Sequence, residues 1–191
     1  MACNMQNKVS IRLMSGGHAF SNNDIETIKN AGCDVVVEVV TPKTVLRPEE
    51  GFVLEEAQRD LEATGHVVAE DEVVVCSASL NGRVAIMAVS KRCARAIASL
   101  GVNLCYSSPL LLGDDMAEGS HIALYGDVLY VCVYKGGLRF AEAIHVENDA
   151  DLLYYLESIN RVYGIYNMYA RAIGDRERLN RVCRKCFKTK L

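Results

Sequence analysis

The chain has 191 residues, of which 50% are apolar and 24% charged, and its formal net charge is −3. This ordinary globular composition excludes a disordered chain, and the apolar runs are too short for a helix that crosses a bilayer. A chain of this length forms one large domain or two small lobes. The charge is uneven, because residues 161–191 carry nine Lys or Arg and two acidic residues, so the tail is basic and the body acidic.

The cysteines and the N-terminal residues indicate in which cellular compartment the protein is found. Eight cysteines occur, most of them inside apolar runs such as 73–76 and 131–133, which is typical of buried free thiols in a reducing environment. Residues 1–8 contain no apolar segment after a basic start, as a secretory signal would. We therefore expect a cytoplasmic protein.

The first half predicts three strands and a helix. Residues 8–14 alternate apolar and polar side chains, and a turn at 15–17 leads to a short return strand at 18–21. Residues 34–41 are rich in valine and predict a third strand. Residues 49–64 carry apolar side chains at helical spacing.

An inserted block follows this first unit. Residues 71–89 alternate apolar and polar positions on either side of Asn81-Gly82, which is the strongest hairpin signal in the chain. Ser90 is placed to cap a helix over 91–100, and residues 102–106 predict another strand. The block is therefore a β-hairpin, a helix and a strand.

The second half repeats the order of strand, strand, strand, helix. Strands joined by tight turns predict an antiparallel meander over 121–146, and a helix runs from Asp149 to near Gly164. A strand at 166–173 and an amphipathic helix at 176–189 follow. The order in 8–64 thus recurs in 121–163 without evident sequence identity, which indicates a repeat of architecture.

These elements predict an α/β protein of the mixed-sheet, α+β kind. It should consist of two related βββα lobes, residues 1–115, which include the inserted block, and residues 116–191.

Three stretches resemble a bacterial family of uncharacterised proteins, domain of unknown function 3822. They are residues 41–48 before a helix, the strand ending Arg139-Phe140-Ala141-Glu142-Ala143-Ile144, and above all Glu147-Asn148-Asp149-Ala150-Asp151-Leu152-Leu153-Tyr154-Tyr155-Leu156. That family is similar in fold to the actin-like ATPases, a ribonuclease H-like fold whose lobes each begin with three antiparallel strands and a helix. The resemblance implies no catalytic residue. It also implies one more strand after the last helix, so we expect that strand to be missing or supplied by a partner.

Actin-like ATPases hold phosphates with one hairpin loop per lobe, in which an Asp organises Mg²⁺ and glycines let backbone amides approach. The turns in these positions are Gly16-Gly17 and Lys135-Gly136-Gly137, with Gly126-Asp127 as an alternative for the second. The first two contain no carboxylate, so Mg²⁺ lacks its usual ligand and hydrolysis is not expected. Two interpretations stay open: plain turns that require positive φ, or a degenerate nucleotide site with Lys135 beside the phosphate.

Other motifs do not complete a site. The adenosine loop of this fold usually has paired glycines, and this chain offers only Gly174, before Asp175. Cys183 and Cys186 form the only CxxC, which lacks the two further ligands that zinc requires. No serine or cysteine pairs with a histidine at a spacing typical of a triad. We therefore predict no metal site and no catalytic residue.

The leading functional prediction is a non-enzymatic, actin-like scaffold or adaptor without a cofactor. It would bind another protein or a second copy through the C-terminal helix or an open sheet edge. The alternative is an ATP-binding protein or weak ATPase that holds Mg-ATP between the lobes. Nucleic acid is less favoured as a partner of the basic residues 176–191, because the acidic body would repel a phosphate backbone. No membrane contact is predicted.

Overall fold

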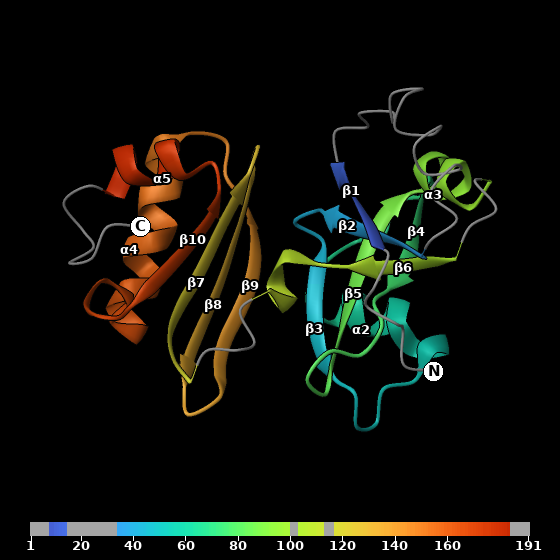
Figure 1. Ribbon diagram of the computed structural model, residues 1–191, viewed down its shortest axis with the longest axis horizontal. Coiled ribbons are helices and arrows are strands. Elements are labelled where there is room, and N and C mark those ends of the chain that lie inside the picture. The colour runs from blue at the N-terminus through green and yellow to red at the C-terminus, as the bar shows by residue number, and fades with distance from the viewer. Residues whose placement is uncertain (1–7, 15–33, 100–102, 113–116, 184–191) are drawn as a thin grey trace. The chain divides into compact units, whose positions relative to one another are not determined.

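The computed structural model of the protein describes residues 8–14, 34–99, 103–112 and 117–183 (Figure 1). The chain divides into two compact units, Met1–Ser108 and Pro109–Leu191. Each unit has its own β-structure.

The second unit contains a four-stranded sheet in the order β10-β7-β8-β9. β7 (Glu118–Tyr125), β8 (Val128–Lys135) and β9 (Leu138–His145) form the predicted antiparallel meander. β10 (Ala170–Gly174) pairs with β7 in parallel. A parallel neighbour requires a crossover connection, which the helix between β9 and β10 provides.

That helix is α4 (Asp149–Tyr163), and its ends agree with the sequence. Asn148 caps its N-terminus by accepting hydrogen bonds from the backbone N–H groups of Ala150 and Asp151 at 2.8 and 3.0 Å. Gly164 ends it in the left-handed region at φ 71°. The short helix η3 (Ile165–Asn167) then leads into β10.

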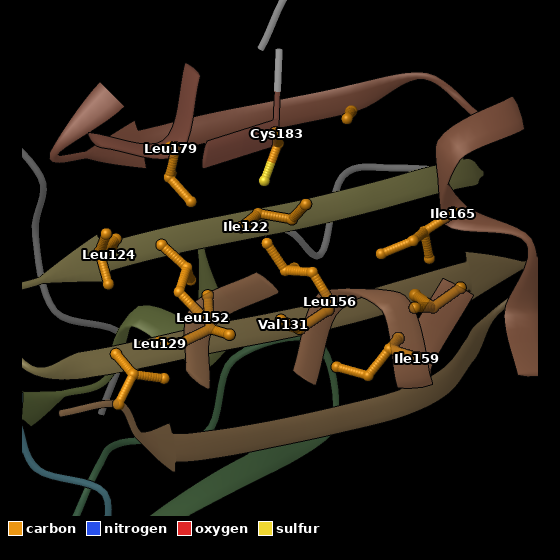
Figure 2. Close-up of a cluster of buried hydrophobic side chains, with 13 residues drawn as sticks. Ile122, Leu124, Leu129, Val131, Leu152, Leu156, Ile159, Ile165, Leu179 and Cys183 are labelled. Atoms are coloured by element: carbon orange, nitrogen blue, oxygen red, sulfur yellow. The ribbon is translucent and has the colours of Figure 1, made fainter. Parts of the chain in front are cut away.

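The core of this unit lies between the sheet and two helices, α4 and α5 (Arg176–Cys183) (Figure 2). Alternate residues of β7 and β8 point to the same side as the apolar faces of both helices. The buried members are Ile122, Leu124, Leu129, Val131, Val133, Val146, Leu152, Leu156, Ile159, Ile165, Ala170, Leu179 and Cys183. On the other face, η2 (Pro109–Leu111) contacts β8, where the Cys132 thiol donates to the Leu110 carbonyl at 3.4 Å.

The described residues of the first unit form two three-stranded sheets. In one of them β1 (Lys8–Met14), β2 (Asp34–Val40) and β6 (Leu104–Ser107) are all parallel, in the order β1-β2-β6. The strands predicted over 8–14 and 34–41 are present, and they are parallel neighbours. The turn and return strand predicted over 15–21 lie outside the described residues, so the βββα order is not established for this unit.

The other sheet has the order β3-β5-β4 and is antiparallel. β4 (Glu72–Cys76) and β5 (Arg83–Ser90) form the predicted hairpin, and Asn81 and Gly82 turn it at φ 50° and 72°. β3 (Thr44–Pro48) was not predicted, because it begins two residues after Pro42, ends in Pro48 and shows little alternation.

In its described residues, the first unit has two α-helices, α2 (Ala57–Ala63) and α3 (Lys91–Ala98). Ser90 caps α3 as predicted, accepting from the N–H of Arg92 at 3.2 Å. The helix predicted over 49–64 is shorter, because the chain turns at Gly51, where φ is 78°, and passes through η1 (Leu54–Glu56). Apolar side chains before η1 mimic helical spacing, since Phe52 packs from the loop against the α2 core, which is the buried cluster of Ala57, Leu61, Ile86 and Ala88.

Candidate functional site

The two turns of the second unit's meander lie at opposite ends of its sheet. Lys135-Gly136-Gly137 joins β8 to β9, beside the start of β7, whereas Gly126-Asp127 joins β7 to β8. Gly136 and Gly137 have φ of 63° and 129° and open space where a Cβ would lie, so they act as turn glycines. Lys135 is exposed, and its N–H donates to the Gly137 carbonyl at 2.9 Å. Gly16 and Gly17, the other predicted phosphate turn, lie outside the described residues.

The carboxyl ends of β7 and β10 meet at the Gly126-Asp127 end. Here Gly174 has φ 81°, and a Cβ on it would lie 2.0 Å from the carbonyl oxygen of Leu124. The next residue, Asp175, donates its N–H to the same oxygen at 2.8 Å. Gly174 is therefore required by a close approach of two backbones.

Arg178 of α5 fastens three elements at this end. Its Nε donates to Asp149 Oδ1, at the start of α4, at 2.7 Å, and its Nη1 donates to the Gly126 carbonyl in the β7–β8 turn at 3.1 Å. Asp149 Oδ2 also accepts from Arg181 Nη2 at 3.2 Å. Hydrogen bonds from Arg178 and Arg181 hold the pKa of the Asp149 carboxyl below its usual value.

Two further acidic side chains at this end of the sheet, Asp127 and Asp175, also have protein partners. Asp127 lies 3.1 Å from Nε2 of His145, and Asp175 accepts from the backbone N–H of Arg178 at 2.9 Å, as the cap of α5. Pairing of the carboxylates with protein donors is an arrangement suited to stability rather than to binding a metal ion. Among the described residues, no cluster of three or more His, Cys, Asp or Glu is placed to hold a metal.

A pocket of about 120 Å³ lies in the first unit, where the parallel strands β1 and β2 end. Its lining combines apolar side chains from these strands and β5 with polar groups from the neighbouring segments. Ligands of open α/β sheets bind at the carboxyl ends of strands. Pockets for drug-sized ligands measure roughly 300–1,000 Å³, so this one accepts only a small group. Its lining residues are Leu13, Met14, Val39, Val40, Thr41, Asp71, Glu72, Ala88, Val89, Ser90 and Cys93.

The charge of Glu72 at this pocket is neutralised within the protein. Its Oε2 accepts from Lys43 Nζ at 2.6 Å and from the Ala69 N–H at 2.7 Å. Burial by itself would raise the pKa of the Glu72 carboxyl, but these two hydrogen bonds and the Lys43 charge lower it below the usual value. The backbone carbonyl of Asp71 accepts a hydrogen bond from the Lys91 N–H at 2.8 Å, and Asp71 is exposed.

The β10 edge is the open side of the second unit's sheet. β10 pairs with β7 on one side and, within the residues that the structure describes, with no strand on the other. The Tyr169 carbonyl accepts from the Ser120 N–H at 2.9 Å, and the Asp175 N–H donates to Leu124. Because the backbone groups of a strand alternate in direction, Ala170, Ala172 and Gly174 direct theirs away from β7. An edge of this kind is a template for another strand.

The C-terminal helix is the other surface predicted to bind a partner. In α5, Leu179 and Cys183 are buried in the unit's own core (Figure 2), and Val182 packs against it. The sheet edge is therefore the better candidate of the two.

Comparison with solved structures identifies the class of fold. A Bacteroides thetaiotaomicron protein with an actin-like ATPase fold and unknown function is similar, with a TM-score of 0.63 and 15% sequence identity. The match covers 80% of this chain and 66% of that one. The cytoplasmic domain of EpsL, an inner membrane component of the type II secretion system of Vibrio cholerae, also matches, at 14% identity. That match covers 87% of this chain and 82% of the EpsL domain, but its TM-score of 0.46 is too low to indicate a shared fold.

The chain therefore has an actin-like ATPase fold, as the resemblance implied. No protein-family model and no curated protein matches it, so membership of domain of unknown function 3822 stays a prediction. In the residues that the structure describes, no helix has the length and apolar character to cross a membrane.

Two features of the site were missed from the sequence. In the sequence, Arg178 is only one of the basic residues of 176–191. Its place in the first turn of a helix, where the helix dipole disfavours a positive charge, is the signal that could have indicated a specific acceptor. The pocket had no sequence signal, because most of its lining residues are ordinary members of strands.

Proposed function

We propose that this protein is a non-enzymatic, cytoplasmic scaffold or adaptor built from two actin-like lobes and related to domain of unknown function 3822. The outer edge of β10 would receive an extended segment of a partner protein. The observation that carries this proposal is the row of outward backbone groups on Ala170, Ala172 and Gly174, which have no strand beside them among the described residues.

Strand addition suits this edge physically. Each main-chain hydrogen bond that a partner makes contributes roughly 0.5–1.5 kcal/mol net, and side-chain contacts then provide specificity. Ala170, Ala172 and Gly174 are small, so a partner backbone can approach closely. Tyr169, just before the strand, is 65% exposed and offers an aromatic contact at one end of the edge.

A phage-displayed library of random peptides tests this edge directly. Ala172→Pro removes an outward N–H donor and leaves the β7-facing groups of β10 in place, whereas Ala172→Ser keeps the donor and is the matched control. Peptides selected on the wild-type chain should bind the Ser variant and lose at least tenfold in affinity for the Pro variant. Equal binding to the two variants, or no enriched peptide, would refute the β10 edge as the docking site.

Nucleotide binding is the second candidate, because ligands of open α/β sheets bind where strands such as β1 and β2 end. The pocket at that place has room for only a small part of a nucleotide. The internal pairing of Asp127, Asp149 and Asp175 argues against it, because these carboxylates would have to give up protein partners to organise Mg²⁺. Isothermal titration with Mg-ATP separates the two functions. The scaffold proposal expects no binding heat, and micromolar binding would refute a simple scaffold without a cofactor.

A further inference from the structure

The two sheets of the first unit meet along β4 and β6 (Figure 1). Within the described residues, one isolated parallel bridge, between Ser77 and Tyr106, joins them. The residues that precede this bridge on the two strands are both cysteines, Cys76 at the end of β4 and Cys105 in β6. The junction of β4 and β6, called the seam below, therefore has little backbone pairing and a cysteine on each strand.

The register of the bridge places these thiols next to each other. In a parallel pair, residues one step before a bridge also lie opposite each other, and their side chains point to the same face. Neighbouring strands are about 4.8 Å apart, which falls within the ~4.4–6.8 Å that separates the Cα atoms of a disulfide. Their Cβ atoms must approach by up to about 1 Å, to the ~3.8 Å of a disulfide. A ladder with a single bridge can accommodate that movement.

The surroundings allow a small reagent to reach the pair. Cys76 and Cys105 are both free and half-buried. Cys76 packs at the border of the α2 core, against Ile86 and its neighbours, and this burial raises the pKa of its thiol. Of the other described cysteines, Cys132 and Cys183 are buried, and Cys93 lies on α3, in neither β4 nor β6.

We propose that Cys76 and Cys105 form a reversible disulfide that locks β4 to β6 when the protein meets an oxidising small-molecule disulfide. One thiol loses its proton, and the thiolate attacks oxidised glutathione, releasing one reduced glutathione and leaving a mixed disulfide. The second thiolate attacks the mixed disulfide, so that the protein S–S bond forms and the second glutathione leaves. The protein loses two electrons and two protons, and glutathione disulfide gains them.

The disulfide form and the reduced form of the protein differ in how the two sheets are joined. Without the bond, the seam depends on side-chain packing and the Ser77–Tyr106 bridge. With it, a covalent link closes the chain between residues 76 and 105, which restricts the unfolded chain and raises the stability of the first unit. The bond reports on the redox state and acts on a different unit from the β10 edge.

Peptide mapping after treatment of the full chain with oxidised glutathione tests the proposal. We expect a Cys76–Cys105 linked peptide, a loss of two titratable thiols, and a thermal unfolding midpoint several degrees higher that returns on reduction. Cys76→Ser and Cys105→Ser should each abolish the linked peptide and the shift, whereas Cys93→Ser, the half-buried matched control, should retain both.

Three results would overturn it. These are two stable mixed disulfides with glutathione, a link of either cysteine to a third one, or an unchanged unfolding midpoint in the linked protein. Because oxidation of a buried thiol requires its thiolate, the linked form should appear several-fold faster at pH 8.5 than at pH 7. This pH dependence is expected when thiolate attack in the folded protein limits the rate. It is not expected when the rate is limited by slow unfolding of the chain before the cysteines react.

Discussion

Replacement of Gly174 by alanine should be the most damaging single-methyl addition in the second unit. A Cβ at this position lies 2.0 Å from the Leu124 oxygen and 2.9 Å from its carbonyl carbon, both backbone atoms. The left-handed φ of 81° costs about 1–2 kcal/mol for a residue with a Cβ. Separation of the two backbones also breaks the 2.8 Å bond from Asp175 N–H, worth about 1 kcal/mol. We expect a loss of about 3 kcal/mol in unfolding free energy.

Gly164→Ala is the matched control, because Gly164 has a similar φ of 71° and no atom within 4 Å of the added Cβ. It should cost only about 1 kcal/mol. Urea unfolding followed by circular dichroism gives both free energies, and amide exchange in β7 and β10 assigns the loss to the second unit. Equal losses in the two variants would refute the argument from backbone contact.

Three further predictions concern burial, capping and charge. Leu156→Ala should destabilise by about 3 kcal/mol, because Leu156 is fully buried under the sheet, whereas Val162→Ala, 72% exposed on the same helix, should change stability by less than about 0.5 kcal/mol in the same urea assay. Asn148→Ala should cost about 1 kcal/mol and fray the first turn of α4, visible as faster amide exchange there. The lowered pKa of Glu72 gives stability that is present above its ordinary value of 4.5 and is lost as the pH falls through the folded value. Glu72→Gln should therefore be less stable than the wild type at pH 7, and the difference should shrink below pH 4.5; a constant difference would contradict the bond with Lys43.

Local chemistry explains why the second unit was predicted well. Its strands are joined by two-residue turns, and α4 carries its own signals in Asn148 and Gly164. Because β7, β8 and β9 pair with their neighbours in sequence, alternation alone determines which strands meet. The parallel pairing of β10 with β7 follows from a crossover helix, which the pattern of elements also contains.

Pairing over long distances explains the differences in the first unit. β2 has buried valines on both faces, with Val35, Val37 and Val39 on one and Val40 on the other, so its sequence shows a strand without indicating its neighbours. β6 joins β2 from residues more than sixty positions away. Propensity and alternation describe single strands, and such pairings depend on tertiary packing that they do not encode.

For the candidate sites too, local features could be predicted from the sequence and long-range ones could not. Turn glycines were recognised because a positive φ is a local requirement, as at Gly136 and Gly137. Whether a turn lies near the carboxyl ends of β7 and β10 depends on register, and the register places Gly126-Asp127 there and Lys135 at the opposite end. The pairing of Asp149 with Arg178 spans 29 positions, and no sequence pattern linked the two residues.

The connectivity of the second unit also sets an order of assembly. β7, β8 and β9 follow one another through two-residue turns, whereas β10 joins β7 only after α4 has crossed the sheet. Short-range pairings form faster than long-range ones, so we expect the meander to form first and β10 to dock last. During synthesis, the outer side of β7 is then exposed until β10 arrives. A partner strand that recognises the β10 edge can bind only to a chain that has finished folding, and this timing would distinguish mature protein from nascent chains.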